Sequence, residues 1–150
     1  MEQNPLFKNL HILECTGCHF SEWIIKNDAI FCKNCNNKYQ KIENKIIACD
    51  NYFVEEKWEE TNVTFEPKNP KNPWINRING PKIASLRNKY NIEGFAINLG
   101  SGQDTHKGFI NIDLGNYKPV HIVSDITKTP IRSNSIELIV SNSVLEHIYN

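Results

Sequence analysis

The chain has 150 residues with 17 basic and 17 acidic side chains, a balance that gives no general attraction to nucleic acid or to anionic membranes. Its content of 39% hydrophobic and 23% charged residues is typical of a globular protein and excludes a largely disordered chain. No apolar run approaches the roughly 18 residues of a membrane span, and the polar start lacks the features of a signal peptide, which predicts a cytoplasmic protein without membrane association.

Shifts in composition along the chain predict an α/β protein made of two small units. Residues 10–50 contain paired cysteines between short alternating segments, and residues 81–150 alternate apolar runs with polar residues. Residues 51–80 are expected to be a linker with a proline-rich segment. Its three closely spaced prolines exclude a helix or a central strand there: Pro67, Pro70 and Pro73.

Two cysteine pairs organise the first unit. Cys15-x-x-Cys18 and Cys32-x-x-Cys35 are each spaced to wrap one side of a tetrahedral metal ion, and four thiolates predict a closed, structural zinc site. The alternatives are two disulfides, which a cytoplasmic chain disfavours, or free thiols, which the paired spacing disfavours. His19 is a weaker candidate ligand, and Cys49 is expected to be a small buried residue or a bystander.

Alternating apolar residues around the cysteines predict a three-stranded sheet, with strands over 12–15, 29–32 and 38–42. The cysteine pairs, followed by Tyr39-x-x-Ile42 and Lys45-Ile46-Ile47, make residues 10–50 resemble the small zinc-ribbon family that activates tRNA and protein methyltransferases. The chain departs from the family pattern at four positions, Gln40, Glu43, Asn44 and Lys45. A unit this small buries too little apolar surface to fold alone, so zinc is expected to supply much of its stability.

The region before the second unit allows several interpretations. Residues 51–66 could form a short acidic helix or a solvated face. Residues 68–89 hold six basic residues and no acidic one, with aromatic residues interleaved, which is compatible with a nucleic-acid contact. The favoured interpretation is a helix that begins at Pro81 and places three apolar residues on one stripe: Ile83, Leu86 and Tyr90.

Four strands are predicted in the second unit, and a polar or glycine-rich segment follows each. Strand 95–99 precedes Gly100-Ser101-Gly102, strand 109–112 precedes Asp113, strand 120–124 precedes Asp125-Ile126, and strand 136–140 precedes Ser141-Asn142. In an open parallel sheet, ligands bind beyond the carboxyl ends of the strands. A nicotinamide cofactor is disfavoured, because Thr105 stands where its motif expects a third glycine and Asp113 follows Gly100 by only thirteen residues.

These segments in this order resemble the front half of a class I S-adenosylmethionine (SAM) methyltransferase of the type 11-like group. The resemblance rests on Leu99-Gly100-Ser101-Gly102, Ile112-Asp113, Asp125-Ile126 and Leu145-Glu146-His147. It implies a partial Rossmann-like sheet of about four strands after the zinc ribbon. It also implies a SAM site that contains seven residues, Gly100, Ser101, Gly102, Asp113, Asp125, Ile126 and Ser141, with His147 near the methyl acceptor as a candidate general base.

Two features depart from a complete methyltransferase. The segment between Gly102 and Phe109 is too short for a full crossover helix, and only the amino-terminal half of the domain is recognisable. The fourth strand should then leave Ile139 and Val140 on an exposed edge, so we expect self-association or a separate carboxyl-terminal half. Ser143-x-x-Glu146 predicts a capping box that starts a helix.

Two alternatives to a methyltransferase stay open. The chain could be a non-catalytic zinc-ribbon adapter that docks on a methyltransferase or on nucleic acid. It could also be an unrelated α/β core with polar strand ends. The sequence does not identify the methyl acceptor, because the elements that usually determine acceptor specificity are not recognisable in it.

Overall fold

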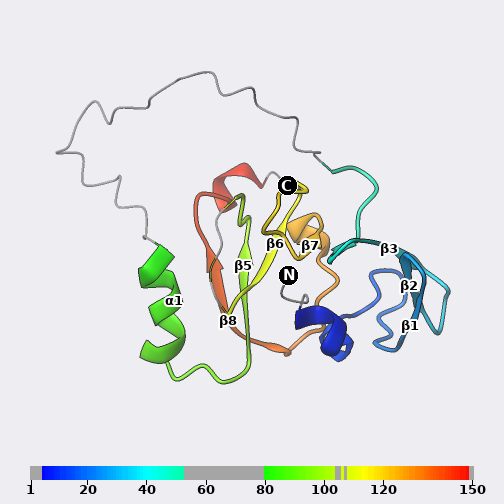
Figure 1. Ribbon diagram of the computed structural model, residues 1–150, viewed down its shortest axis with the longest axis horizontal. Coiled ribbons are helices and arrows are strands. Elements are labelled where there is room, and N and C mark those ends of the chain that lie inside the picture. The colour runs from blue at the N-terminus through cyan, green and yellow to red at the C-terminus, as the bar shows by residue number, and fades with distance from the viewer. Residues whose placement is uncertain (1–4, 53–79, 104–105, 107, 149–150) are drawn as a thin grey trace, which may run out of the picture.

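The computed structural model describes residues 5–52, 80–103, 106 and 108–148, and within them it forms one mixed sheet of eight strands (Figure 1). The strand order across the sheet is β1-β2-β3-β4-β7-β6-β5-β8. The strands span β1 Trp23–Lys26, β2 Ala29–Cys32, β3 Lys38–Ile42, β4 Lys45–Ile47, β5 Phe95–Leu99, β6 Ile110–Asp113, β7 Ile122–Val123 and β8 Ile136–Ser141. Strands β1 to β4 pair antiparallel, and every later pairing is parallel.

Helices are few in the described part of the chain. One α-helix, α1, spans Gly80–Lys89, and four short 3-10 helices span η1 Pro5–Lys8, η2 Leu10–Ile12, η4 Ile126–Lys128 and η5 Leu145–His147. None of these helices is long and apolar enough to cross a bilayer. The mixed sheet agrees with the predicted α/β class only in part, because strands dominate the described residues.

The cysteine-containing region differs from its prediction at both ends. The strands predicted over 29–32 and 38–42 are confirmed as β2 and β3. The strand predicted over 12–15 is wrong, because Ile12 ends η2 and Leu13 forms only an isolated bridge with Ile131. The backbone of this segment forms a hydrogen bond with a segment far away in the sequence instead, because the Arg132 amide donates to the Ile12 carbonyl at 2.8 Å. Strands β1 and β4 join the two confirmed strands, so the antiparallel part has four strands instead of the three predicted.

The cysteine-containing region and the parallel strands share one sheet and one core. Strand β4 pairs with β7 in parallel, with Ile46 opposite Ile122. The Ile46 amide donates to the His121 carbonyl at 3.0 Å, and the Ala48 amide donates to the Val123 carbonyl at 2.8 Å. The largest core cluster draws on both regions: Leu6, Ile12, Leu13, Ile30, Tyr39, Ile46, Ile97, Ile110, Ile112 and Ile122. The sequence-based division at 10–50 and 81–150 does not anticipate this pairing, and residues 53–79 of the expected linker lie outside the described residues.

The parallel strands follow the order of a doubly wound sheet. In chain order they are β5, β6, β7 and β8, and in space they lie as β7-β6-β5-β8. Numbered in chain order, these strands lie as 3-2-1-4, so the order reverses between the first, β5, and the fourth, β8; in open parallel sheets ligands bind at such a reversal point. Strand β5 matches its prediction, and β7 is shorter than predicted.

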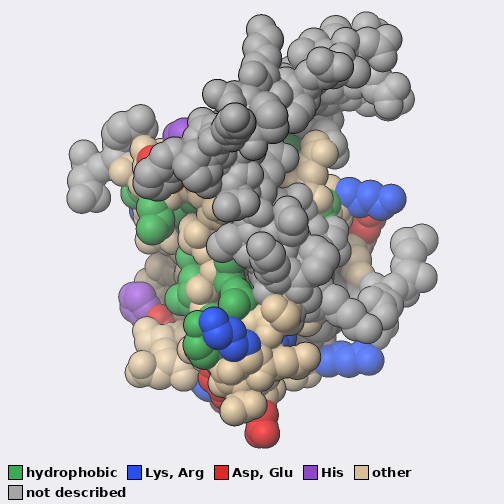
Figure 2. Space-filling model, turned by 90° about the vertical axis from the view of Figure 1, so that its left-hand side faces the viewer, with side chains coloured by type: hydrophobic (Ala, Val, Ile, Leu, Met, Phe, Trp, Pro, Cys, Tyr) green, Lys and Arg blue, Asp and Glu red, His purple; other side chains and the backbone are tan. Residues whose placement is uncertain are grey.

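Strand β8 lies at one end of the sheet, and its apolar residues differ in burial. Ile139 is 58% exposed, as predicted, whereas the prediction that Val140 is exposed is wrong. Val140 is 8% exposed because it packs with Ala96 and Phe109 on the face that also contacts Leu86 of α1. Figure 2 looks onto this side of the molecule, where hydrophobic side chains reach the surface between charged ones.

The helix α1 is confirmed, but its predicted stripe is not complete. Leu86 packs on the sheet, whereas Tyr90 lies beyond the last helical residue and is 56% exposed. The side chain of Ile83 lies outside the described residues. The Arg87 guanidinium donates to the carbonyls of Ile92 at 3.2 Å and Gly94 at 2.9 Å, and so holds the helix end beside the start of β5.

The helix predicted from the Ser143-x-x-Glu146 capping box is wrong. Only the 3-10 helix η5 forms, its N-cap position is Val144, and no side chain caps it. Ser143 adopts a φ of 55°, in the left-handed region, whereas a capping serine needs an extended backbone. Residues 53–66, including the rest of the possible acidic helix, lie outside the described residues.

Candidate functional site

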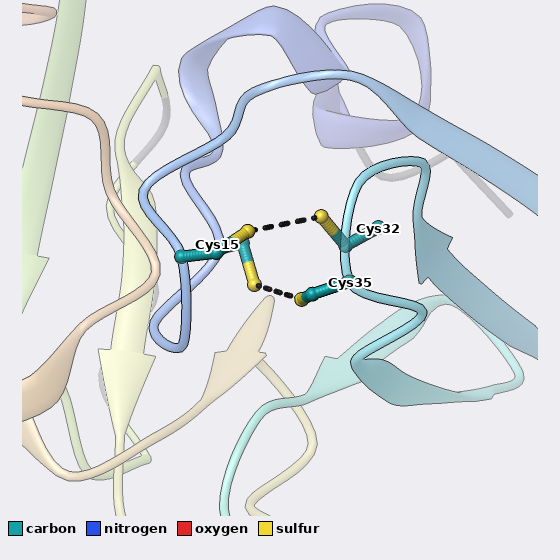
Figure 3. A group of neighbouring side chains, drawn as sticks. Cys15, Cys32 and Cys35 are labelled. Carbon is teal, nitrogen blue, oxygen red and sulfur yellow. Dashed lines mark hydrogen bonds between the residues drawn. The ribbon is translucent and has the colours of Figure 1, made fainter.

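Four cysteine thiols converge at the end of the antiparallel strands. All four sulfur atoms lie within 4.8 Å of one another, and the closest pairs are Cys15 with Cys35 at 3.6 Å and Cys18 with Cys32 at 3.5 Å. A tetrahedral zinc site with Zn–S bonds of about 2.3 Å has sulfur atoms about 3.8 Å apart, whereas a disulfide needs about 2.0 Å. Figure 3 shows Cys15, Cys32 and Cys35 pointing toward one another from facing turns. The four residues are therefore positioned to bind a metal ion.

The two cysteine pairs adopt equivalent turns. After the first pair, the His19 amide donates to the Cys15 carbonyl at 2.8 Å, and after the second, the Asn36 amide donates to the Cys32 carbonyl at 3.0 Å. Both His19 and Asn36 have a φ of 58°. Such left-handed residues turn the chain sharply, and asparagine and histidine are enriched in this conformation. Each turn thereby directs both of its thiols toward the same point.

The first turn is anchored to the sheet by Tyr39. The Tyr39 hydroxyl accepts a hydrogen bond from the Thr16 amide at 2.8 Å, and its ring lies 5.1 Å from the Trp23 ring. The Trp23 indole in turn donates to the Leu13 carbonyl at 3.3 Å. Burial raises the pKa of Tyr39, which keeps this hydroxyl protonated at neutral pH. The position of the thiols is therefore coupled to the core.

The electrostatics of the cluster favour a bound cation. Burial opposes ionisation of Cys15, but hydrogen bonds from the Gly17 amide and the Asn37 side chain outweigh it and lower its pKa to about 6. At Cys35 the Asn37 amide lowers the pKa, but the neighbouring Cys18 thiol and burial outweigh it and raise the pKa to about 12. Ionisation of one thiol thus opposes ionisation of its neighbours, and a central cation would offset the repulsion between the thiolates.

The weaker candidates for this centre lie outside it. The His19 ring pairs with the Glu14 carboxylate at 2.6 Å and is 78% exposed. The Cys49 thiol donates to the Val123 carbonyl at 3.6 Å, and burial raises its pKa. Neither side chain belongs to the group of converging ligand atoms within the described residues.

A pocket of about 460 Å³ lies at the carboxyl ends of the parallel strands. It brings together five of the residues predicted from the sequence: Gly100, Asp113, Asp125, Ile126 and His147. Five further residues complete its lining: Leu114, Thr127, Ser143, Val144 and Ile148. Sequence reasoning misses these five, although each follows a strand end directly or lies within one short turn of a predicted residue. The pocket occupies the crevice expected for this strand order.

Asp113 holds the glycine turn in place. One carboxylate oxygen accepts from the Gly102 amide at 2.8 Å, and the other accepts from the Gly115 amide at 2.7 Å. Gly100 and Gly102 have φ values of 64° and 55°, which glycine adopts without strain. Because each carboxylate oxygen can accept a second hydrogen bond, Asp113 retains capacity for ligand hydroxyls.

Asp125 is a second carboxylate that lines this pocket. Its carboxylate accepts from the Thr127 hydroxyl at 2.7 Å and from the Thr127 amide at 2.8 Å. These two hydrogen bonds lower the pKa of Asp125, so its carboxylate is charged at neutral pH. Ile126 begins η4 directly after this capping residue. A charged acceptor and a partly buried apolar side chain therefore lie next to each other.

Two serine hydroxyls at the same end of the sheet are buried without a partner. The Oγ atoms of Ser101 and Ser141 make no hydrogen bond within the described residues. Ser141 ends β8 opposite Leu99, and Ser101 follows β5 by two residues, so both belong to the point where the strand order reverses. Unsatisfied buried hydroxyls are costly, and they are a common sign of an absent ligand or water. Ser101, Gly102 and Ser141 do not line the pocket itself.

Comparisons with protein-family models, curated proteins and solved structures find no match for this chain. Its candidate sites are thus the four-thiol centre and the pocket at the strand ends. The thiol centre can hold a metal ion and leaves no position for substrate. The pocket combines a charged carboxylate, a second carboxylate with spare capacity, an apolar side chain and an exposed histidine.

Proposed function

We propose that this chain binds SAM in the pocket at the strand ends and belongs to a class I methyltransferase whose acceptor is not identified. The observation that carries the proposal is that Gly100, Asp113, Asp125 and His147 line one pocket at the reversal point of a 3-2-1-4 parallel sheet. Gly100, Asp113 and Asp125 lie at or just after the ends of three different strands, and His147 lies in η5, which follows β8. A nucleoside with a charged amino-acid tail needs this combination of hydroxyl acceptors, apolar contact and close backbone approach.

The residues present fit such a ligand. Asp113 would accept the ribose hydroxyls with the lone pairs that the Gly102 and Gly115 amides leave free. Asp125 and Ile126 would contact the adenine by hydrogen bond and apolar packing. SAM supplies an activated methyl group, so the protein mainly orients the acceptor and excludes water.

His147 is proposed as the group that accepts a proton from the methyl acceptor. It lies in η5 on the wall of the pocket, and its side chain is exposed. An exposed imidazole on the pocket wall can accept a proton from a bound acceptor and pass it on to solvent. A small molecule, a glycan, a tRNA or a protein could each serve as acceptor.

Zinc is proposed as the ion of the four-thiol centre. Its sulfur atoms already have nearly the spacing of a tetrahedral thiolate site, and thiolates favour zinc among abundant ions. Because all four positions are protein ligands, the ion would be structural. It would hold Cys15 and Cys35, which belong to different turns, at a fixed separation.

Calorimetric titration with S-adenosylhomocysteine, the demethylated product, tests the proposed function. Metal-loaded protein should bind it with micromolar affinity, and Asp113→Ala should abolish the heat of binding. Asp28→Asn is the matched control, because it also removes one carboxylate but lies on the exposed β1–β2 turn. Because Asp113 also holds two backbone amides, thermal melts must show that the Asp113→Ala variant is folded. Ile126→Ala provides a second test, and its affinity for S-adenosylhomocysteine should be about tenfold lower than that of the wild type. A folded wild type that does not bind would contradict the proposal.

A zinc-ribbon adapter is the second candidate function. The exposed apolar residues of the antiparallel region favour it, because Ile24 and Ile25 of the edge strand β1 are 39% and 44% exposed. A binding partner would cover these residues. An adapter should keep its partner when Asp113 is replaced, whereas a SAM-binding protein should lose its ligand.

A further inference from the structure

Val144 lies directly against the glycine turn that the proposed cofactor must approach. A Cβ atom placed on Gly100 would lie 2.1 Å from one Val144 methyl carbon and 2.9 Å from the other. The absence of a side chain at Gly100 is therefore used to accommodate Val144. Both residues line the pocket, so the valine occupies space that a ligand would need to reach the Gly100 backbone.

The residue before Val144 is strained in this position. Ser143 has a φ of 55°, a conformation that costs a residue with a side chain free energy relative to the usual regions. Its Oγ does not compensate by capping the helix, because η5 has no side-chain cap. The chain therefore reaches the contact between Val144 and Gly100 through an unfavourable backbone conformation.

The segment that carries Val144 is weakly attached. Its own backbone supplies two hydrogen bonds, from His147 to the Val144 carbonyl at 2.9 Å and from Ile148 to the Leu145 carbonyl at 3.2 Å. Within the described part of the chain, no side-chain hydrogen bond or ion pair ties residues 143–148 to another element. Leu145 is 66% exposed and adds little packing. Few contacts must break for this segment to move.

We propose that Ser143–Ile148 is a latch that closes on Gly100 in the free protein and opens when a nucleoside ligand binds. In the open state Val144 leaves Gly100 and Ser143 relaxes to a negative φ. Because His147 lies on the same segment, opening also moves the proposed proton acceptor. The inference rests on the proposed SAM site and adds a specific regulator of its affinity, Val144.

Trimming Val144 tests the latch. If the latch is closed in about nine molecules out of ten, Val144→Ala should strengthen binding of S-adenosylhomocysteine about tenfold in the calorimeter. Ile139→Ala is the matched control, because it trims an exposed apolar residue of β8 outside the pocket. Ser143→Gly should weaken binding about fivefold, because glycine makes the closed backbone favourable.

A nuclear Overhauser effect gives a readout that does not depend on affinity. Cross-peaks between the Val144 methyl groups and the Gly100 Hα protons should be present in the free protein and disappear on saturation with S-adenosylhomocysteine. Wild-type binding with unchanged cross-peaks, or Val144→Ala that binds no tighter, would overturn the latch and leave the proposed function intact. No binding by either folded protein would overturn both.

Discussion

The metal centre and the pocket at the strand ends are assembled in different ways. The metal centre comes from two segments of four residues, which adopt the same turn and direct their thiols to one point. The pocket draws on the ends of β5, β6, β7 and β8, and one of its own residues, Val144, fills the space at Gly100. A site made of local repeats is encoded by spacing, whereas a site made of strand ends depends on the strand order.

The same sheet connects the two sites. Strand β4 follows directly from β3, which carries the Tyr39 anchor of the first cysteine turn, and β4 pairs with β7. Strand β7 leads to Asp125 and Ile126 of the pocket. The Glu14 amide, next to Cys15, also donates to the Pro130 carbonyl at 3.1 Å, just after η4. This continuity predicts that the two sites fold as one unit.

Metal removal should have the largest effect. Structural zinc contributes about 10–16 kcal/mol in small zinc proteins, which is comparable to the entire stability of a domain, about 5–15 kcal/mol. Cys32→Ser, which removes a buried ligand, or chelation should therefore unfold the chain beyond the antiparallel strands. Circular dichroism melts, with metal content measured by elemental analysis, check this.

The matched control for Cys32→Ser is Cys49→Ser. Its thiol lies outside the cluster, so this variant should retain one metal ion per chain and a melt close to that of the wild type. If chelated protein kept a cooperative melt for the parallel strands alone, the two sites would be independent units. The molecule would then consist of two units with the boundaries predicted from the sequence, residues 10–50 and 81–150.

Ile46→Ala should have the next largest effect. Ile46 is fully buried in the core shared by both regions and lies opposite Ile122 across the β4–β7 pairing. Removing its side chain should lower the free energy of unfolding by about 2–5 kcal/mol, as for other buried aliphatic residues. Urea denaturation monitored by tryptophan fluorescence measures it.

The control for Ile46→Ala is Ile42→Ala on the neighbouring strand β3. Ile42 is 37% exposed, so its replacement should cost clearly less. A single transition in both variants would support one cooperative unit. Two transitions in Ile46→Ala, with the metal retained, would show that this pairing alone joins the regions.

The parts of the fold that the sequence predicts are those set by nearby residues. Strands β2, β3 and β5 follow from alternating or continuous apolar runs, and the convergence of the four thiols follows from the spacing of the cysteines. The errors occur where distant contacts decide. Leu13 forms a bridge with Ile131 instead of a strand, and Ser143 adopts a left-handed backbone while Val144 packs on Gly100. Neither contact leaves a periodic pattern in the sequence.

The pairing of β4 with β7 is the clearest case of a feature that sequence reasoning does not reach. The two strands have three and two residues, too short for a distinctive pattern, and about half of the chain separates them. The candidate pocket could be predicted from the sequence in part. Gly100, Asp113 and Asp125 could be placed at one edge because parallel strands end together, but the burial of the unpaired Ser101 hydroxyl depends on tertiary packing that the sequence does not reveal.

The smallest predicted effect is a pH dependence at the joint between the two regions. His121 precedes β7, and its Nδ1 accepts a hydrogen bond from the Asn111 amide at 2.9 Å, which requires a neutral ring. Burial and the nearby Lys45 ammonium lower the pKa of His121 below its usual value of about 6.5. The unfolded chain then binds more protons than the folded chain between the two pKa values, so stability rises with pH in that window. The stabilising contribution is complete above about pH 6.5 and is lost as the pH falls through the folded pKa.

His121→Asn should remove this dependence while its side-chain oxygen still accepts from the Asn111 amide. The measurement is the difference in the free energy of unfolding between wild type and variant, from urea titrations at pH 7.5 down to pH 5. Because acid-induced metal release affects both proteins alike, it cancels from the difference. The wild type should lose stability relative to the variant below about pH 6.5. A difference that stayed constant with pH would mean that His121 has the same pKa folded and unfolded, and that the joint between the regions does not respond to protonation.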